Sequence, residues 1–434
     1  MTAPAPNAVT PAAAEDLATR YQRVRAFTEH LCAPLEVDDY QIQSITETSP
    51  PKWHIAHVTW FFEAFVLGHF VPNYRPARPA FHYLFNSYYQ TVGEMHPRPQ
   101  RGLLSRPTVA EVQAYRAEID QHMLALIART ERAATGGPQH DALAQRITLG
   151  LHHEQQHQEL LLMDIKHNFW SNPLRPAYTT PAVPPQSAQV HPAPGWVEHP
   201  GGPCTLGAAD AGFAYDNESP RHQTLLQPHR LADRLVTNAE FAAFIDDGGY
   251  RRPELWLADG WHWLQQQRVT APLYWFRADD APHHSQWQEF RLSGPAPLEA
   301  AAPVCHVSYF EADAFARWAG ARLPTEAELE QRLSTLPVQG NFVDDGHLHP
   351  RPGQDQWFGD VWEWTQSPYS PYPGFRPLDG SLGEYNGKFM CNQYVLRGGC
   401  CLSSREHVRA TYRNFFYPHD RWAMTGIRLA EDLQ

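Results

Sequence analysis

The sequence has few of the features that would place it outside the cell or on a nucleic acid. Only six of its 434 residues are cysteine and none form a CxxC pair, so we expect reduced thiols rather than a disulfide framework. Lys and Arg number 35 against 47 Asp and Glu, which gives a formal net charge of -12. This balance argues against the basic surface that a nucleic acid would need. We expect no nucleic-acid partner, and small molecules are the favoured class of partner.

Long apolar runs are also missing. No uninterrupted apolar stretch approaches the roughly 18 to 20 residues that span a bilayer. The amino-terminal segment MTAPAPNAVTPAAAEDLATRYQR has no basic stretch followed by an apolar run, which a secretion signal would show. We therefore expect a soluble, cytoplasmic protein with no membrane partner. Hydrophobic residues make up 42% of the chain, enough for sizeable cores, and its length favours two domains.

The first part of the chain has the periodicity of helices. Apolar residues recur at three- and four-residue spacing in the segments 12–32 and 108–134, as they do along a buried helix face. The segments 53–70 and 140–169 are further helical stretches. Four helices of this length predict a bundle, whose interior is a natural place for a metal site.

A proline-rich segment follows the helices. Residues 173–195 are dense in proline and lack periodicity, which favours an extended interdomain linker. Beyond it, short segments rich in Gly, Pro, Trp and Tyr alternate with turn signals, with short helices expected at 238–248 and 309–321. We predict an α+β protein with a helical domain over 1–172, a linker over 173–195 and a mixed, loop-rich domain over 196–434.

The strongest chemical signal is the segment LHHEQQHQELL. His153 and His157 are four residues apart, so on a helix they project from one face on adjacent turns. Ile147, Gly150 and Leu161 share this face, which turns both rings toward the interior of the bundle. The spacing suits two imidazoles on one metal, although satisfied core histidines would show the same pattern.

A third ligand would have to come from another helix. His54 and His57, in an aromatic-rich stretch, are the best placed and nearly equal candidates, while His30, His69 and His96 are less well placed. Three histidines with open coordination positions would suit zinc or iron. The segment HEQQH also fits the zinc-protease pattern HExxH, in which Glu154 would be the general base. No further zinc-protease pattern follows it.

Seven motifs resemble those of the EgtB sulfoxide synthase family. In chain order they are SPPKWHIAHVTWFFE, FNSYYQTVGEMHPRPQRGLLSRP, HHEQQHQEL, GGYRRPELW, RLPTEAELE, GDVWEWT and YVLRGGC, and the resemblance covers nearly the whole chain. The resemblance implies an amino-terminal DinB-like four-helix bundle and a carboxy-terminal domain similar to formylglycine-generating enzymes, with a C-type-lectin-like fold. It also implies that His57, His153 and His157 hold iron(II), which decides between His54 and His57.

The implied reaction couples a thiol donor, expected to be cysteine, to C2 of the imidazole of Nα-trimethylhistidine (hercynine). The product is a sulfoxide of ergothioneine biosynthesis, and dioxygen is the co-substrate. Three neutral imidazoles would leave positions on iron(II) at which the reactants can gather and be oriented.

Four residues of the segment FNSYYQTVGEMHPRPQRGLLSRP are candidates for catalysis or donor binding. Tyr88 and Tyr89 match the tandem tyrosines of the cysteine-using branch of the family and would supply a proton or an electron. Arg101 and Arg106 are candidates for clamping a donor carboxylate, because guanidinium groups bind carboxylates bidentately. A packing role for the tyrosines and a solvated loop for the arginines are the competing interpretations.

Four more residues would contact hercynine. Gln156 matches a family position that forms a hydrogen bond with the substrate imidazole. Asn414, Phe415 and Phe416 match a loop that closes over the trimethylammonium group, and an aromatic face attracts a quaternary cation. Buried packing is the competing role for the two phenylalanines.

Three rival interpretations fit the sequence to different degrees. Cys400 stands where the family usually has serine, which leaves room for the selenoneine branch, in which a selenosugar is joined to hercynine through a C–Se bond. Formylglycine generation needs two cysteines shortly after RGG, where this chain has Ser403 and Val408, so we expect that chemistry to be absent. The third alternative is a binding module with a structural metal. The sequence does not predict an oligomeric state.

Overall fold

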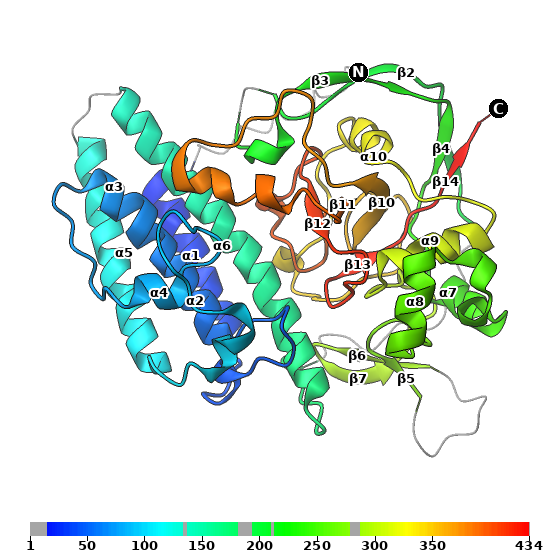
Figure 1. Cartoon of the computed structure of the whole chain (residues 1–434), viewed down its shortest axis with the longest axis horizontal. Coiled ribbons are helices and arrows are strands. Elements are labelled where there is room, and N and C mark those ends of the chain that lie inside the picture. The colour runs from blue at the N-terminus through cyan, green and yellow to red at the C-terminus, as the bar shows by residue number, and fades with distance from the viewer. Residues whose placement is uncertain (1–14, 133–136, 181–192, 210–211, 278–286, 434) are drawn as a thin grey trace, which may run out of the picture.

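The computed structural model describes residues 15–132, 137–180, 193–209, 212–277 and 287–433. The predicted α+β class is confirmed, because a helical first half is followed by a second half built on small sheets (Figure 1). No helix within these described ranges is long and apolar enough to cross a membrane.

Four long helices form the bundle of the first half: α1 (Leu17–Cys32), α2 (Pro51–Phe62), α5 (Val109–Arg132) and α6 (Pro138–Ser171). Local chemistry sets where they begin, since the Asp16 side chain caps α1 by accepting from the backbone of Thr19, and proline opens both α2 and α6. The shorter helical elements are η1 (Asp39–Gln41), the π-helical η2 (Glu63–Leu67), α3 (Gly68–Phe70), α4 (Phe81–Phe85) and η3 (Arg98–Leu103).

Helix α2 lies at the centre of the bundle, and all twelve of its residues are buried. Helix α6 packs directly against it. A Cβ atom at Gly150 would lie 2.6 Å from the Phe62 ring and 3.1 Å from the Phe61 ring, so the absence of a side chain there permits the close approach of α6 to α2. This contact brings the histidine-bearing faces of the two helices together.

The described residues of the second half form five small sheets. The largest has the order β12-β11-β10-β13 and is antiparallel except for the parallel pair of β10 and β13; its strands are β10 (Trp362–Pro368), β11 (Tyr394–Arg397), β12 (Asn414–Phe416) and β13 (Thr425–Gly426). The second sheet has the antiparallel order β1-β4-β14, with β1 (Trp196–His199), β4 (His229–Ala232) and β14 (Ala430–Asp432). The remaining strands are β2 (Gly202–Leu206), β3 (His222–Leu226), β5 (Trp275–Phe276), β6 (Gln288–Arg291), β7 (Gly294–Pro297), β8 (Gly340–Asn341) and β9 (Phe358–Gly359).

Short helices connect these strands. Those of α-type are α7 (Asn238–Asp246), α8 (Ala258–Gln267), α9 (Tyr309–Trp318) and α10 (Glu326–Leu333), and α7, α9 and α10 each begin with a capping box. Helices α7 and α9 confirm the two short helices predicted for this half. The 3-10 turns are η4 (Asp216–Glu218), η5 (Gly249–Arg251), η6 (Pro253–Leu255), η7 (Val343–Asp345), η8 (Gly380–Glu384), η9 (Gly387–Phe389) and η10 (Arg405–His407).

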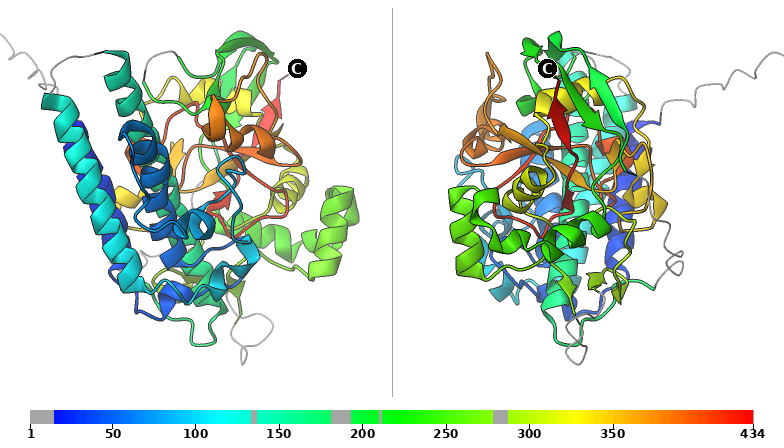
Figure 2. Two further views of the ribbon diagram at one scale, coloured as in Figure 1. Left: turned by 60° about the vertical axis from the view of Figure 1, so that its left-hand side comes forward. Right: turned by 90° about the vertical axis from the view of Figure 1, so that its right-hand side faces the viewer.

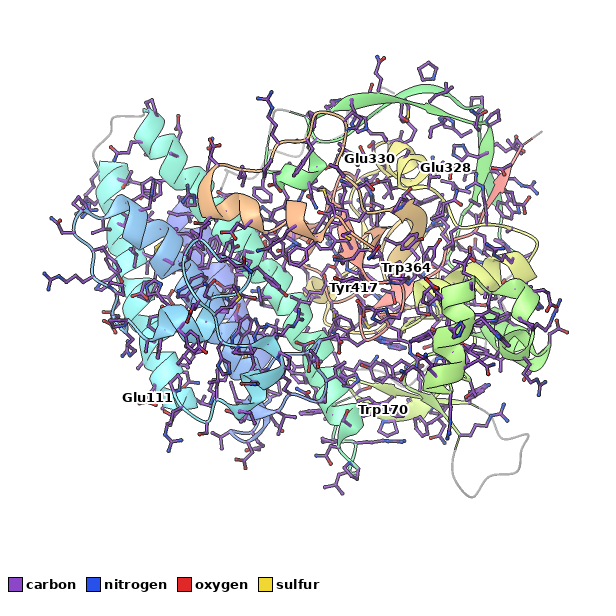
Figure 3. All side chains as sticks on the ribbon, viewed as in Figure 1. Glu111, Trp170, Glu328, Glu330, Trp364 and Tyr417 are labelled. Atoms are coloured by element: carbon purple, nitrogen blue, oxygen red, sulfur yellow. The ribbon has the colours of Figure 1, made fainter. Side chains whose placement is uncertain are left out.

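Helix α6 joins the two halves, since it lies between the other bundle helices and the sheets (Figures 1 and 2). Lys166 Nζ donates to His306 Nε2 at 2.8 Å, and Trp362 Nε1 donates to Glu159 Oε1 at 2.7 Å. Toward the carboxyl end of α6, the Trp170 ring contacts the β5–β7 sheet (Figure 3). One helix therefore carries both bundle contacts and contacts with the second half.

The predicted linker over 173–195 falls largely outside the described residues, because 181–192 are not among them. Its described start has no helix or strand. There, the Tyr178 hydroxyl donates to the carbonyl of Leu31 on α1 at 2.6 Å, and the Tyr178 N–H donates to Leu292 in the second half at 2.7 Å. The predicted domain boundaries stay a prediction.

Candidate metal centre and substrate cavity

Three histidines from two helices converge in the bundle. His57 lies on α2, His153 and His157 lie on α6, and their potential ligand atoms are all within 4.8 Å of one another. The Nε2 atoms of His57 and His153 are 3.3 Å apart. In the described part of the chain, this is the one group of three or more potential ligands close enough to share an ion.

Neighbouring groups orient two of these rings. His57 Nδ1 is 2.6 Å from the carbonyl oxygen of Phe85, so Nδ1–H donates to that carbonyl and Nε2 keeps its lone pair. His54 Nε2 is 2.9 Å from Asp164 Oδ2, and His54 Nδ1 is 2.8 Å from His157 Nδ1. Because His54 donates to the carboxylate, its Nδ1 accepts from His157. The Nε2 atom of His157 is therefore also left with a lone pair.

The electrostatics of the cluster suit a cation. Burial lowers the pKa values of His57 and His157 well below the usual range, and it lowers that of His153 to about 4. The rings are therefore neutral, which is the form that binds a metal. Two nitrogens that are each about 2.1 Å from one ion lie about 3.0 to 3.4 Å apart, as the Nε2 atoms of His57 and His153 do. These residues fit a three-histidine metal site.

Glu154 is not part of this centre. It is fully buried and accepts hydrogen bonds from Arg25, Arg116 and Thr28, each at 2.7 to 2.8 Å. Burial opposes its charge, but the two guanidinium groups outweigh that effect and lower its pKa to about 2. A zinc-protease base must contact water at the metal, whereas both oxygens of Glu154 are engaged in a structural ion pair. The HExxH interpretation is therefore wrong.

Two adjoining cavities lie at and beside the cluster. The smaller, of about 50 Å³, is lined by the three histidines. The larger, of about 370 Å³, lies between α6 and loops of the second half, where Figure 3 shows Tyr417. Four residues line both cavities: Tyr88, Arg98, Leu160 and Tyr385. The larger cavity therefore continues toward the histidines.

The structure gathers most of the predicted site residues around these cavities. The larger cavity is lined by Gln156, Asn414, Phe415 and Phe416. Phe415 stacks on Tyr369 with ring centroids 4.1 Å apart, so it both packs and lines the cavity. Tyr88 lines both cavities, whereas Tyr89 lines the smaller one only.

The two predicted arginines behave differently. Arg101 is buried in the wall of the smaller cavity and donates to Ser49 Oγ and Ser87 Oγ, both at 2.9 Å. Burial lowers its pKa to about 9, and no carboxylate of the described residues lies within ion-pair distance of it. A buried guanidinium without a carboxylate suits an anionic ligand.

Arg106 is not at the site, which corrects the prediction that it forms part of the clamp. Its side chain is exposed, donates to the neighbouring carbonyl of Ser105 and lines neither cavity. Arg98 lies there instead and donates to the Tyr88 hydroxyl at 2.6 Å. One sequence feature could have identified Arg98 as a site residue, namely its three-residue spacing from Arg101. On the 3-10 turn η3 this spacing places both side chains on one side.

Among the lining residues of the larger cavity that the sequence did not predict are Tyr385, Tyr412 and Asp420. All three lie outside the helices and strands of the second half, where no periodicity marks a residue as facing the site. His54 was a candidate ligand, but it lies outside the three-histidine group and contacts His157 and Asp164 instead.

Comparison with known proteins identifies two domain families in the chain. Residues 20–161 match the DinB superfamily, and residues 180–351 and 351–433 match the sulfatase-modifying factor enzyme 1-like domain. The hercynine oxygenase of Mycolicibacterium thermoresistibile is 33% identical over 420 residues, which cover 89% of this chain and 88% of the relative. That of Mycobacterium tuberculosis is 32% identical over 451 residues, which cover 96% and 99%. The formylglycine-generating enzyme of Streptomyces coelicolor is 29% identical over 328 residues, which cover 60% and 95%.

Proposed function

Since this chain belongs to the EgtB-type hercynine oxygenase family, we propose that it is an iron(II)- and dioxygen-dependent sulfoxide synthase. It joins the sulfur of a thiol donor, cysteine, to C2 of the imidazole of hercynine. The observation that carries this proposal is the convergence of His57, His153 and His157 beside a cavity large enough for a small molecule.

The reaction balances with dioxygen as the oxidant. The C2–H bond of the imidazole and the S–H bond of the donor break, and a C–S bond forms. One oxygen atom of dioxygen becomes the sulfoxide oxygen, and the other leaves as water with the two hydrogens. Iron(II) held by the three histidines would supply the reactivity with dioxygen that organic side chains lack.

The larger cavity suits hercynine. The aromatic rings of Phe389, Phe415 and Phe416 line it, and such rings attract a quaternary ammonium group. Gln156 lies one residue before His157 on α6 and lines the same cavity. These positions allow the trimethylammonium group to lie among the aromatic rings while the imidazole faces the histidines.

The smaller cavity favours a donor with a carboxylate. Arg101 is buried in its wall without a carboxylate partner among the described residues, so a donor carboxylate would complete an ion pair. Arg98, which lines both cavities, can take part in the same contact. Cysteine brings its thiol and carboxylate close together, which matches the short distance that a cavity of this size allows.

The test is anaerobic loading with iron(II), then exposure to dioxygen with hercynine and one donor at a time, read by mass spectrometry. The donors are cysteine, γ-glutamylcysteine and a selenosugar. We expect a sulfoxide adduct with cysteine and none from the His57→Ala variant. A product made only from the selenosugar would overturn the thiol donor, and no product from any donor despite bound iron would overturn the synthase and favour a metal-containing binding module.

A further inference from the structure

A chain of hydrogen bonds leads from helix α1 to the wall of the larger cavity. Arg20 Nη2 lies 3.2 Å from His152 Nε2, and His152 Nδ1 lies 3.0 Å from His407 Nδ1. His407 Nε2 lies 3.0 Å from the Tyr412 hydroxyl, which also accepts from Gln156 Nε2 at 2.7 Å. Tyr412 and Gln156 line the cavity.

The first member of the chain fixes the direction of every bond. A guanidinium can only donate, so Arg20 donates to His152 Nε2. The proton of a neutral His152 is then on Nδ1 and is donated to His407 Nδ1. Burial and the nearby Arg409 and Arg20 lower the pKa of His407 well below its usual range, so this ring carries its single proton on Nε2. His407 therefore donates to the Tyr412 oxygen.

The Tyr412 oxygen accepts two hydrogen bonds, from His407 and from Gln156, which occupy both of its lone pairs. Its own proton has no acceptor among the described residues, although the residue is only 4% exposed. The amide oxygen of Gln156 likewise accepts nothing from them. At this place the cavity wall therefore offers one donor, Tyr412 O–H, beside one acceptor, Gln156 Oε1.

We infer that the chain from Arg20 sets the Tyr412 hydroxyl as a hydrogen-bond donor to the carboxylate of the betaine substrate, beside Gln156 as acceptor for its imidazole N–H. This inference rests on the proposed function. The trimethylammonium group offers no acceptor, and the imidazole offers one N–H and one ring nitrogen for the metal. The carboxylate is the remaining acceptor of the molecule.

The basic residue Arg413 is already paired with other protein groups and is not available to the substrate carboxylate. Arg413 lines the cavity, but its guanidinium donates to both oxygens of Glu326 and to the carbonyls of Asn217 and Ser370. In this inference Tyr412 is the substrate-binding residue, and Arg20, His152 and His407 are positioning residues that act through it.

The experiment measures calorimetric binding of hercynine and of its decarboxylated analogue, Nα-trimethylhistamine, to metal-loaded protein. Tyr412→Phe should weaken hercynine binding about 10- to 100-fold, as expected for loss of a hydrogen bond to a charged group. It should leave the analogue's affinity within about twofold. Tyr83→Phe is the control, because Tyr83 is exposed and lines neither cavity.

A remote variant tests the direction of the chain. Arg20→Met, on α1, should reduce the preference for hercynine over the analogue about threefold or more, whereas Arg20→Lys keeps a donor and should retain it. Arg23→Met is the control. Arg23 also lies on α1 and pairs with Glu406, but it does not contact His152 or His407.

The outcomes distinguish a failure of the proposed function from a failure of the inferred role of Tyr412. Wild-type protein that binds metal but not hercynine would overturn both the proposed function and this inference. Undiminished hercynine binding by Tyr412→Phe, or an equal loss for both ligands, would overturn the inference alone. If Tyr412→Phe does not fold, as judged by circular dichroism, an unchanged ligand preference in Arg20→Met overturns it instead.

Discussion

His54 and His157 share a hydrogen bond of 2.8 Å between their Nδ1 atoms, and Asp164 accepts from the other nitrogen of His54. This relay leaves the Nε2 atom of His157 free for a metal. We predict that His54→Phe lowers iron(II) affinity about 10- to 100-fold while still allowing one ion per chain. His157→Ala should abolish binding at micromolar iron.

Titration of the apoprotein with iron(II) under anaerobic conditions would measure these effects. His69→Ala is the control, because His69 is exposed and outside the cluster. Equal iron affinity for His54→Phe and wild type would contradict the relay.

Tyr88 and Tyr89 are adjacent in sequence but differ in position. Tyr88 lines both cavities, and its hydroxyl accepts from Arg98, so its own proton can be donated into the site. The Tyr89 ring is buried against Phe65 and Trp60. We predict that Tyr88→Phe lowers kcat about 100-fold or more, with a much smaller loss for Tyr89→Phe. Single-turnover kinetics would compare them, and the reverse order would contradict the assignment.

Arg101 and Arg106 provide a matched pair for the donor site. Arg101 is buried and lines the smaller cavity, whereas Arg106 is exposed. We predict that Arg101→Met raises KM for cysteine about 10- to 100-fold, and that Arg106→Met changes it less than about twofold. The KM for hercynine should change little in both variants. A similar rise in KM for both substrates in Arg101→Met would instead indicate a general structural role.

The helical part of the site could be predicted from sequence, because the periodicity of a helix is local. The four-residue spacing of His153 and His157 placed both rings on one face, and the structure brings them to His57. The choice between His54 and His57 needed the family resemblance, since both lie on α2. Only the contacts of His54 with His157 and Asp164 show what its side chain does.

The remaining site residues depend on long-range folding. Tyr385, Tyr412 and Asp420 come from loops of the second half, and their positions depend on how those loops pack against α6. Arg106 was predicted, like Arg101, because a guanidinium group binds a carboxylate bidentately, but the 3-10 turn η3 ends at Leu103. The regular three-residue spacing that aligns Arg98 with Arg101 therefore does not extend to Arg106.

Asp420 provides a prediction about pH and stability. Burial raises the pKa of its carboxyl group to about 7, against a hydrogen bond from the backbone of Tyr417 that lowers it. The folded protein therefore keeps this proton between about pH 4 and pH 7, whereas the unfolded chain loses it near pH 4. Because the unfolded state binds fewer protons in this window, the free energy of unfolding decreases as the pH rises toward 7 and levels off above it.

Asp420→Asn removes this titration while keeping the size of the side chain. The difference in the free energy of unfolding, Asp420→Asn minus wild type, should increase between pH 5 and pH 8 by on the order of 2 kcal/mol. Urea unfolding at several pH values would measure the difference, with the exposed Asp379→Asn as the control expected to show no such change. Parallel pH profiles for Asp420→Asn and wild type would mean that the Asp420 carboxyl group is ionised throughout this range. The cavity wall beside His419 and Tyr417 would then carry a negative charge at neutral pH, and it would attract a cationic group of the substrate.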